Sequence, residues 1–344
     1  MPVSLLGRGS DTDRAATCSH TCIMLCANRG SKMPTAVSLF SGCGGSDAGI
    51  LRAGFDVLMA NDILHYAREV YLANHPETDY IRANIATVES FPAADLLVGC
   101  YPCQGFSQGG LRNPDRKINT LYLEFARALK CVKPKAFIVE NVSGMFRKNF
   151  RHLLEDQLKV FSELGYRVSA EILNASEFGV AQERKRIFIV GIRQDLGVEY
   201  EFPTPTHGVD CEFEKKSIRQ AIGDMPAWPS GEFYDLDFHW YYLSRDRRNG
   251  WDDTSRTIVA NPRHMPLHPM SPPMVKLEHN VWTFADDGPA RRFSYREAAR
   301  IQGFGDLIFP ETKNSSQMQR YTVVGNAVPP PLFEAVSRAL PDIW

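Results

Sequence analysis

Short apolar runs and segments of helical periodicity alternate along the first part of the chain. The apolar runs have the length of buried strands, and they lie at residues 36–40, 55–60, 95–99, 136–139, 167–173 and 187–192. The segments between them carry apolar side chains at helical spacing, at residues 46–52, 66–74, 121–131 and 152–164. Strands that alternate with helices indicate a mostly parallel sheet with helices on both faces, so the pattern predicts an α/β fold.

The pattern changes near Phe202, where Pro, Trp, His and Arg become frequent and the long helical periods end. Helical spacing returns only at residues 295–301 and 332–339. We therefore predict a catalytic, cofactor-binding domain, a smaller loop-rich domain and a disordered N-terminal extension. Their bounds are 34–203 (completed by 322–344), 204–310 and 1–33, respectively.

Composition narrows the class of protein only modestly. The 344 residues hold 39 Lys and Arg against 40 Asp and Glu, which excludes a polycation but allows a local basic face for nucleic acid. The apolar runs are much shorter than the ~20 residues of a membrane helix. The first residues lack the apolar core of a secretory signal, so we expect a cytoplasmic protein with reduced thiols.

Three early cysteines, Cys18, Cys22 and Cys26, have a spacing that suggests a metal site. Zinc sites usually pair two such motifs, and no second pair lies nearby. We therefore expect no metal, and we interpret these cysteines as part of the N-terminal extension.

A glycine-rich turn follows the first predicted strand. It has the sequence Phe40-Ser41-Gly42-Cys43-Gly44-Gly45, and Asp62 follows the second strand. Ligands of open α/β sheets bind at the carboxyl ends of the strands. Glycines allow a ligand to approach the backbone, and a carboxylate can hold a pair of ribose hydroxyls. The glycine-rich turn and Asp62 together suggest an adenosine-type cofactor, while the G-x-G-G spacing disfavours a dinucleotide.

Reactive side chains lie at the ends of three further strands. Cys103 follows the strand at 95–99, Glu140 ends the strand at 136–139, and Arg184 and Arg186 precede the strand at 187–192. Taken singly, each has an ordinary explanation: a buried small thiol, a solvated strand end, a charged strand edge. Alternation along an extended chain places both arginines on one face, where they can bind an anion or a carbonyl oxygen.

The order and spacing of these features resemble the DNA cytosine-5 methyltransferases of bacterial restriction-modification systems. The resemblance runs from about Thr35 to the C-terminus. Two later blocks also match, Arg300-Ile301-Gln302-Gly303-Phe304 and Gly325-Asn326-Ala327-Val328-Pro329-Pro330. The resemblance implies a Rossmann-like, S-adenosylmethionine-dependent methyltransferase sheet with a smaller, loop-rich target-recognition domain.

The resemblance also implies a chemistry for the site. The Cys103 thiolate adds to C6 of cytosine, so that C5 can take the methyl group of S-adenosylmethionine, while Glu140 stabilises N3 and Arg184 and Arg186 bind O2. The base must leave the duplex to be reached. The implied cofactor ligands are Phe40, Ser41, Gly42, Cys43, Gly44, Asp62, Ile63, Asn84, Ile85, Asn326 and Val328.

Two of these positions depart from the family pattern. The family commonly has Asp where Asn84 stands, and often an aromatic residue where Ile63 stands. We expect retained cofactor binding of altered strength, because an amide oxygen can still accept a hydrogen bond from an adenine amino group.

The partner implied by the resemblance is double-stranded DNA, bound by a monomer. A cognate restriction endonuclease could act on the same site, and the protein would associate with the bacterial nucleoid when bound to DNA. Charges from residue 244 to 300 leave a modest basic surplus. The expected DNA-binding residues are Ser107, Gln108, Arg112, Arg256, Arg263, His264 and His268.

Three other functions remain open from the sequence: a tRNA cytosine-5 methyltransferase, a catalytically inactive DNA-binding regulator and a nicotinamide-dependent dehydrogenase. The sizeable loop-rich region favours DNA over tRNA, and the intact Cys103, Glu140 and Arg184 disfavour an inactive protein. The glycine spacing disfavours the dehydrogenase.

Overall fold

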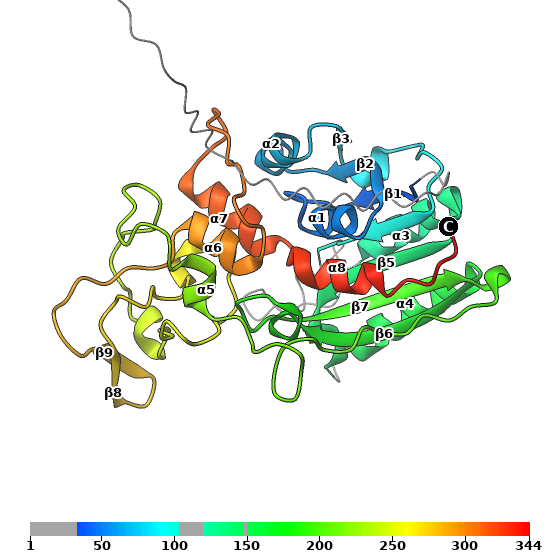
Figure 1. Cartoon of the computed structure of the whole chain (residues 1–344). Coiled ribbons are helices and arrows are strands. Elements are labelled where there is room, and N and C mark those ends of the chain that lie inside the picture. The colour runs from blue at the N-terminus through cyan, green and yellow to red at the C-terminus, as the bar shows by residue number, and fades with distance from the viewer. Residues whose placement is uncertain (1–32, 103–119, 148–149) are drawn as a thin grey trace, which may run out of the picture. The chain divides into compact units, whose positions relative to one another are not determined.

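A central sheet of seven strands organises the fold between residues 35 and 193 (Figure 1). The computed structural model describes residues 33–102, 120–147 and 150–344, and residues 33–344 form one compact unit. The strands lie in the order β3-β2-β1-β4-β5-β7-β6. Among them, β7 runs antiparallel to the other six. Their bounds are β1 Thr35–Leu39, β2 Asp56–Asp62, β3 Asp79–Arg82, β4 Leu96–Gly99, β5 Ala136–Val142, β6 Tyr166–Asn174 and β7 Lys185–Arg193.

Helices cover both faces of the sheet, as the apolar pattern predicts (Figure 1). Successive side chains of a strand point to opposite faces, so each strand supplies two cores. Phe137 and Val139 of β5 pack under the first pair of helices, α3 and α4, whereas Ala136 and Ile138 pack under the second pair, α1 and α8. These helices are α3 Leu121–Val132, α4 Arg151–Glu163, α1 Gly45–Arg52 and α8 Pro330–Arg338, and α2 is His65–Asn74.

The C-terminal helix α8 returns to the start of the sheet and packs tightly on α1. A Cβ atom at Gly49 would lie 2.8 Å from Cβ of Phe333 and 2.9 Å from the backbone nitrogen of Glu334. A side chain at position 49 would therefore separate the two helices. This contact joins the last residues of the chain to the glycine-rich turn.

The remaining part of the chain is loop-rich, as its composition suggests. It contains the short helices α5 Ile218–Ile222, α6 Tyr295–Gln302 and α7 Gln317–Asn326 and the hairpin β8 Met274–Glu278 with β9 Val281–Phe284. A third hydrophobic core, which includes Ile258, Phe293 and Tyr321, joins α5, α6 and α7 to α2. The division between a catalytic and a target-recognition domain stays a prediction.

The sequence pattern did not predict β3, α7 or the hairpin. β3 has only four residues, and α7 is mixed in polarity, so neither carries a strong periodicity. Ser316 does begin α7 with a side-chain cap on the Gln319 backbone nitrogen. Within the described ranges, every helix is too short or too polar to cross a membrane.

Candidate active site

The glycine-rich turn leaves β1 in a strained conformation. Phe40, Gly42 and Gly44 all have positive φ, at 60°, 55° and 90°. A bulky residue such as Phe40 rarely adopts this region, and such strain concentrates at functional sites. The Gly44 nitrogen donates to the Ser41 carbonyl at 2.9 Å, and Ser41 in turn donates from its nitrogen and its hydroxyl to the Asn61 carbonyl. The turn is thus fixed to the end of the neighbouring strand β2.

Asp62 at the end of β2 orders this edge of the sheet. Its Oδ2 accepts a hydrogen bond from the Gly42 nitrogen at 3.0 Å, and its Oδ1 accepts one from the Leu64 nitrogen at 2.9 Å. Burial raises the pKa of this carboxyl, and the backbone donors act against that shift. A hydrogen bond therefore joins Asp62 to the glycine-rich turn. The sequence spacing alone did not show this connection.

The surface beside Asp62 fits an adenosine-type ligand. The Ile63 side chain is 57% exposed, an apolar surface at the strand end. A Cβ atom built on Gly42 would meet nothing within 4 Å, so a ligand has room against the backbone there. Asn84 caps a short 3₁₀ helix by accepting a hydrogen bond from the Ala86 nitrogen, and the buried Ile85 follows it. Asp62 and Ile63 lie at the end of β2, and Asn84 follows the paired strand β3, so an adenosine-type ligand could contact all three.

Cys43 is placed differently from the other turn residues. Its side chain is buried, and its thiol donates to the Val323 carbonyl of α7 at 3.3 Å. Burial raises the pKa of this thiol to about 12, so it stays protonated. The Cys43 side chain faces the protein interior. The expected contact between Cys43 and the cofactor could therefore involve only its backbone.

The closing block contributes through α7 and the start of α8. Asn326 is exposed at the end of α7, whereas Val328 is buried. A Cβ atom at Gly45 would lie 2.3 Å from the Val328 carbonyl oxygen, which is close packing of this block on the glycine turn.

Glu140 is a buried carboxyl at the end of the central strand β5. It is 8% exposed, and its Oε1 forms an ion pair with Nε of Arg186 at 2.9 Å. Burial raises the pKa of the Glu140 carboxyl, and the charges of Arg186 and Arg184 act against that rise. A carboxyl with a raised pKa beside a guanidinium is suited to give and take a proton.

Arg184 and Arg186 both lie near Glu140 but have different partners. The Nη1 of Arg184 donates to the Ile258 carbonyl at 2.9 Å, and its Nη2 donates to the Gly325 and Ala327 carbonyls at 3.0 Å. Arg186 instead pairs with Glu140. Backbone carbonyls thus occupy both terminal nitrogens of Arg184, whereas its Nε has no hydrogen-bond partner among the described residues. The hypothesis that both arginines bind the base stays a prediction.

Arg184 belongs to a buried polar cluster that joins distant parts of the chain. Gln182 donates to the side chain of Gln302, whose Nε2 donates to the Ala327 carbonyl at 2.6 Å. The Ile258 nitrogen donates to Gln182 Oε1 at 3.0 Å. The cluster connects β7, α6 and α7 with the segment around Ile258, and it explains why three separated sequence blocks are polar at buried positions.

Replacement of Gly325 by alanine is expected to destabilise this junction by about 3 kcal/mol. A Cβ atom at this position would lie 2.2 Å from the Ala260 nitrogen and 2.3 Å from the Val259 carbonyl carbon, so two backbone segments would have to separate. Denaturant unfolding measures the change. Met318→Ala, at an exposed position of the same helix, should stay within about 0.5 kcal/mol of the wild type. Equal effects of the two substitutions would contradict the prediction.

Two residues before Cys103, Tyr101 is anchored on three sides. Its ring contacts Phe40 edge-on at 5.9 Å, its hydroxyl donates to Oε1 of Gln157 at 2.5 Å, and its carbonyl accepts a hydrogen bond from Nδ2 of Asn141 at 3.1 Å. The end of β4 is thus fixed to the glycine turn and to β5. The sequence hypothesis did not include Tyr101 or Gln157, because a helix residue 56 positions away gives no local signal. Cys103 itself lies outside the described residues.

The expected DNA-binding residues fall into three groups. Ser107, Gln108 and Arg112 lie outside the described residues. Arg256 and Arg263 are exposed, and Nε of Arg263 donates to the Tyr234 hydroxyl at 3.1 Å. His264 is half-buried beside the Tyr241 ring, with the ring centroids 5.4 Å apart.

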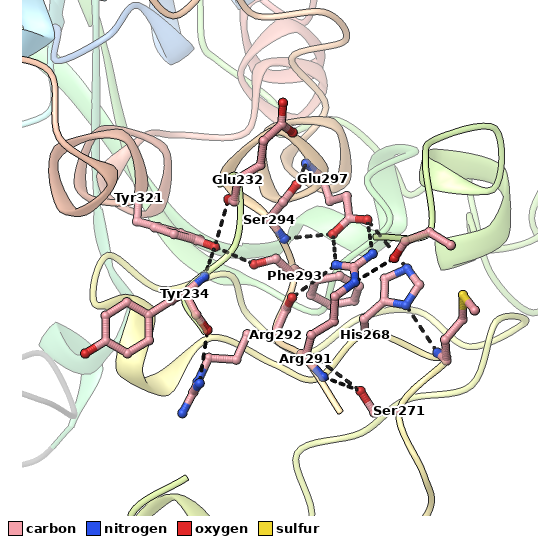
Figure 2. Close-up of polar contacts among 12 residues, drawn as sticks. Glu232, Tyr234, His268, Ser271, Arg291, Arg292, Phe293, Ser294, Glu297 and Tyr321 are labelled. Carbon is pink, nitrogen blue, oxygen red and sulfur yellow. Dashed lines mark hydrogen bonds and ion pairs between the residues drawn. The ribbon is translucent and has the colours of Figure 1, made fainter. Parts of the chain in front are cut away.

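The expectation for His268 is wrong. It is 1% exposed, its Nδ1 accepts a hydrogen bond from the Met270 nitrogen, and its Nε2 lies 3.5 Å from Oε1 of Glu297 (Figure 2). Burial lowers its pKa to about 3, so the ring is neutral. Arg291 forms two hydrogen bonds with Glu297, at 2.8 and 2.7 Å, and satisfies its charge. His268 therefore supports this buried pair and has no access to a base edge.

Among the described residues, no three His, Cys, Asp or Glu side chains converge as metal ligands. Cys18, Cys22 and Cys26 lie outside the described residues.

A seven-stranded sheet of this order, with a glycine turn and an acid at adjacent strand ends, is consistent with the S-adenosylmethionine-dependent methyltransferase fold of the family that the chain matches. Residues 35–342 match the family described as C-5 cytosine-specific DNA methylase. The chain belongs to this family of DNA (cytosine-5)-methyltransferases, and its cofactor is S-adenosylmethionine.

Curated relatives are similar over most of their length. The type II methyltransferase M.BsuRI of Bacillus subtilis is 35% identical over 339 residues, which cover 88% of this chain and 78% of that protein. M.FnuDI of Fusobacterium nucleatum is 35% identical over 329 residues, which cover 89% and 94%.

Solved structures share the fold at low identity. The Entamoeba histolytica methyltransferase EhMeth has a TM-score of 0.66 at 16% identity, covering 90% of this chain and 98% of that one. A mutant of Spodoptera frugiperda DNMT2 has a TM-score of 0.64 at 19% identity, covering 88% and 97%.

Replacement of Asn84 by aspartate is expected to strengthen S-adenosylmethionine binding about threefold, because hydrogen bonds to a charged acceptor are stronger. The carboxylate would still cap the 3₁₀ helix at the Ala86 nitrogen. Isothermal titration of the cofactor measures the change. Asn280→Asp, in the turn after β8, is the control and should not alter binding. Weaker binding by the Asn84 variant would contradict the placement of the adenine.

Proposed function

We propose that this protein methylates carbon 5 of a cytosine that is flipped out of a short, specific duplex DNA sequence. The buried pair of Glu140 and Arg186, beside the strand that leads to Cys103, is the observation that carries the proposal. A base inside a duplex cannot reach a buried carboxyl, so extrusion at a cost of a few kcal/mol is required.

In this proposal Cys103 is the nucleophile. Its thiolate adds to C6 of the cytosine, and the electron pair of the C5–C6 bond becomes available at C5. Bound S-adenosylmethionine supplies the methyl group, which C5 takes from the sulfonium. The C5 proton would then pass to solvent and the Cys103 thiolate would be expelled, which restores the aromatic ring and leaves 5-methylcytosine and S-adenosylhomocysteine as the products.

Glu140 and Arg186 stabilise the charge that this addition creates. Addition at C6 places negative charge on N3, and a protonated Glu140 can share its proton there. Arg186, which is 2.9 Å from Glu140, can hold O2 of the same ring edge. Arg184 would act as a positioning residue, since it ties β7 to the Ile258 segment and to α7.

The cofactor would lie at the ends of β1, β2 and β3. Asp62 would bind the ribose hydroxyls, Ile63 and Phe40 would contact the adenine or the methionine portion, and the backbone of Gly42 and Gly44 would line the pocket. Asn84 would accept from the adenine amino group.

The relatives' names place them in type II systems, and we propose the same setting here: a monomer, with a cognate endonuclease that cuts the same DNA site. The expected location is the cytoplasm, with nucleoid association when the protein is bound to DNA.

The test supplies the purified protein with S-adenosylmethionine labelled in its methyl group and either duplex DNA or tRNA. Bisulfite sequencing of the DNA product identifies the methylated cytosine and its context. Methylation at one short motif supports the proposal. Labelling of tRNA alone would refute the DNA assignment, and cofactor binding without any labelling would favour an inactive DNA-binding regulator.

A further inference from the structure

An exposed aromatic and basic surface lies apart from the catalytic residues, in the loop-rich region. We call it the aromatic–basic face, and it comprises Trp240, Tyr241, Arg245, Arg263 and His264. Trp240 is 81% exposed and Tyr241 is 42% exposed. Large apolar side chains in such exposed positions mark surfaces that bind a partner.

Contacts within the face hold its members in place. The rings of Trp240 and Tyr241 meet edge-on at 5.7 Å, and Tyr241 meets His264 at 5.4 Å. The Arg245 guanidinium lies 5.5 Å from the centre of the Tyr241 ring, and its Nη2 donates to the Tyr241 hydroxyl at 3.2 Å. Binding would therefore cost Tyr241 and Arg245 little side-chain freedom, which favours affinity.

A buried arginine fixes the backbone beneath the face. Arg292 is 1% exposed and lies 4.2 Å from the Phe238 ring centre and 4.7 Å from that of Tyr242. Its Nη1 donates to the carbonyls of Tyr234 and Leu236, and Figure 2 shows it beside Tyr234. The loop that presents Trp240 is thus supported from inside the protein, although it has no regular secondary structure.

The charge around the face suits a polyanion. Residues 239–264 contain five arginines against three aspartates. Asp252 is paired with Arg219, and Asp246 accepts a hydrogen bond from the Arg248 nitrogen. The exposed cationic groups of Arg245, Arg256 and Arg263 are therefore available to phosphates or base edges.

The chain also limits the distance between one end of the face and the segment that Arg184 contacts. The Ile258 carbonyl accepts a hydrogen bond from Arg184, whose charge acts on Glu140. His264 follows Ile258 by six residues, a span of at most about 22 Å even when fully extended. That length corresponds to about six base pairs of duplex at ~3.4 Å each. A DNA site of that length could span from the Ile258 segment to His264.

We propose that Trp240 is a specificity-determining contact to DNA bases beside the target cytosine, with Arg245 as its flanking cation. This inference rests on the proposed function and names the part of the surface that reads the site. An uncharged indole contributes through apolar contact with base edges, such as the thymine methyl group, which depends on the bases and not on the phosphates. Arg245 contributes through charge and therefore sets part of the salt dependence.

The experiment uses the full chain and two fluorescent 30-base-pair duplexes, one with the methylated motif found by bisulfite sequencing and one with that motif scrambled. Anisotropy with S-adenosylhomocysteine present measures both affinities. Trp240→Ala should weaken binding to the motif duplex about tenfold and to the scrambled duplex less than about twofold. Trp240→Phe should restore most of the loss. Arg245→Gln should weaken binding to both duplexes and reduce the salt slope by about one.

Val209→Ala is the matched control, because Val209 is 91% exposed and apolar but lies outside the face. An unchanged affinity of Trp240→Ala, or an equal loss on both duplexes, would overturn the inference. If the wild type methylates its motif while Trp240→Ala binds it normally, only this inference fails. If the wild type produces no 5-methylcytosine in DNA, the proposed function fails and the inference fails with it.

Discussion

Replacement of Cys103 by alanine is expected to reduce methyl transfer to DNA by at least about 10⁴-fold, because the uncatalysed ring carbon is a poor nucleophile. Binding of S-adenosylmethionine should remain within about twofold of the wild type, because its proposed ligands lie on other strands. Transfer of a labelled methyl group measures the first quantity, and isothermal titration of the cofactor measures the second.

A covalent adduct offers a second readout. In a duplex with 5-fluorocytosine at the target position, fluorine cannot leave as a cation, so the methylated adduct cannot release Cys103. The wild type should therefore give a denaturation-resistant complex, and Cys103→Ala should give none. Cys131→Ala removes an exposed thiol from α3 and should behave as the wild type. Adduct formation by the Cys103 variant would contradict its role as the nucleophile.

The fold was largely predictable because its strongest signals are local. The strands β1, β4, β5 and β7 are buried on both faces, so they appear in the sequence as continuous apolar runs. The helices between them carry clear periodicity. The antiparallel direction of β7 was not predicted, because an apolar run has the same appearance in both directions. It depends on the short connection between β6 and β7.

The positions of the candidate residues were more predictable than their partners. The sequence placed Asp62 and Glu140 near the ends of strands, and the structure puts them near the ends of β2 and β5, with Glu140 buried and Asp62 half-buried. The different partners of Arg184 and Arg186 were not predictable, since Arg184 contacts carbonyls more than 70 residues away in the chain. His268 illustrates the opposite error: its exposed-looking, proline-rich surroundings conceal a buried ion pair formed by Arg291 and Glu297.

Trp240 and Tyr241 were also missed, and the reason is physical. A tryptophan in a loop is ordinarily expected to be buried, so its sequence neighbours give no signal of exposure. The explanation lies in Arg292, which is 52 positions later in the sequence than Trp240. Arg292 packs against Phe238 and supports the loop that holds Trp240 outward.

Replacement of Glu140 by glutamine is expected to lower the rate of methyl transfer about 10²–10⁴-fold, because an amide can donate a hydrogen bond to N3 but cannot share a proton with it. Cofactor affinity should be unchanged. Single-turnover rates with saturating DNA and S-adenosylmethionine measure the effect directly, without a contribution from product release. Glu171→Gln is the matched control, because Glu171 is exposed on β6 and pairs with the same residue of β7, Phe188, as Glu140 does.

The pH dependence separates proton sharing from simple packing. Burial raises the pKa of Glu140, so the protonated form that N3 requires persists to higher pH than for an exposed glutamate. The wild-type rate should therefore include a fall as pH rises through this pKa. The Glu140→Gln variant carries no titratable group there, and its rate should lack that fall. A variant that kept the wild-type decline at high pH would place the titrating group elsewhere and would leave Glu140 with a structural role beside Arg186.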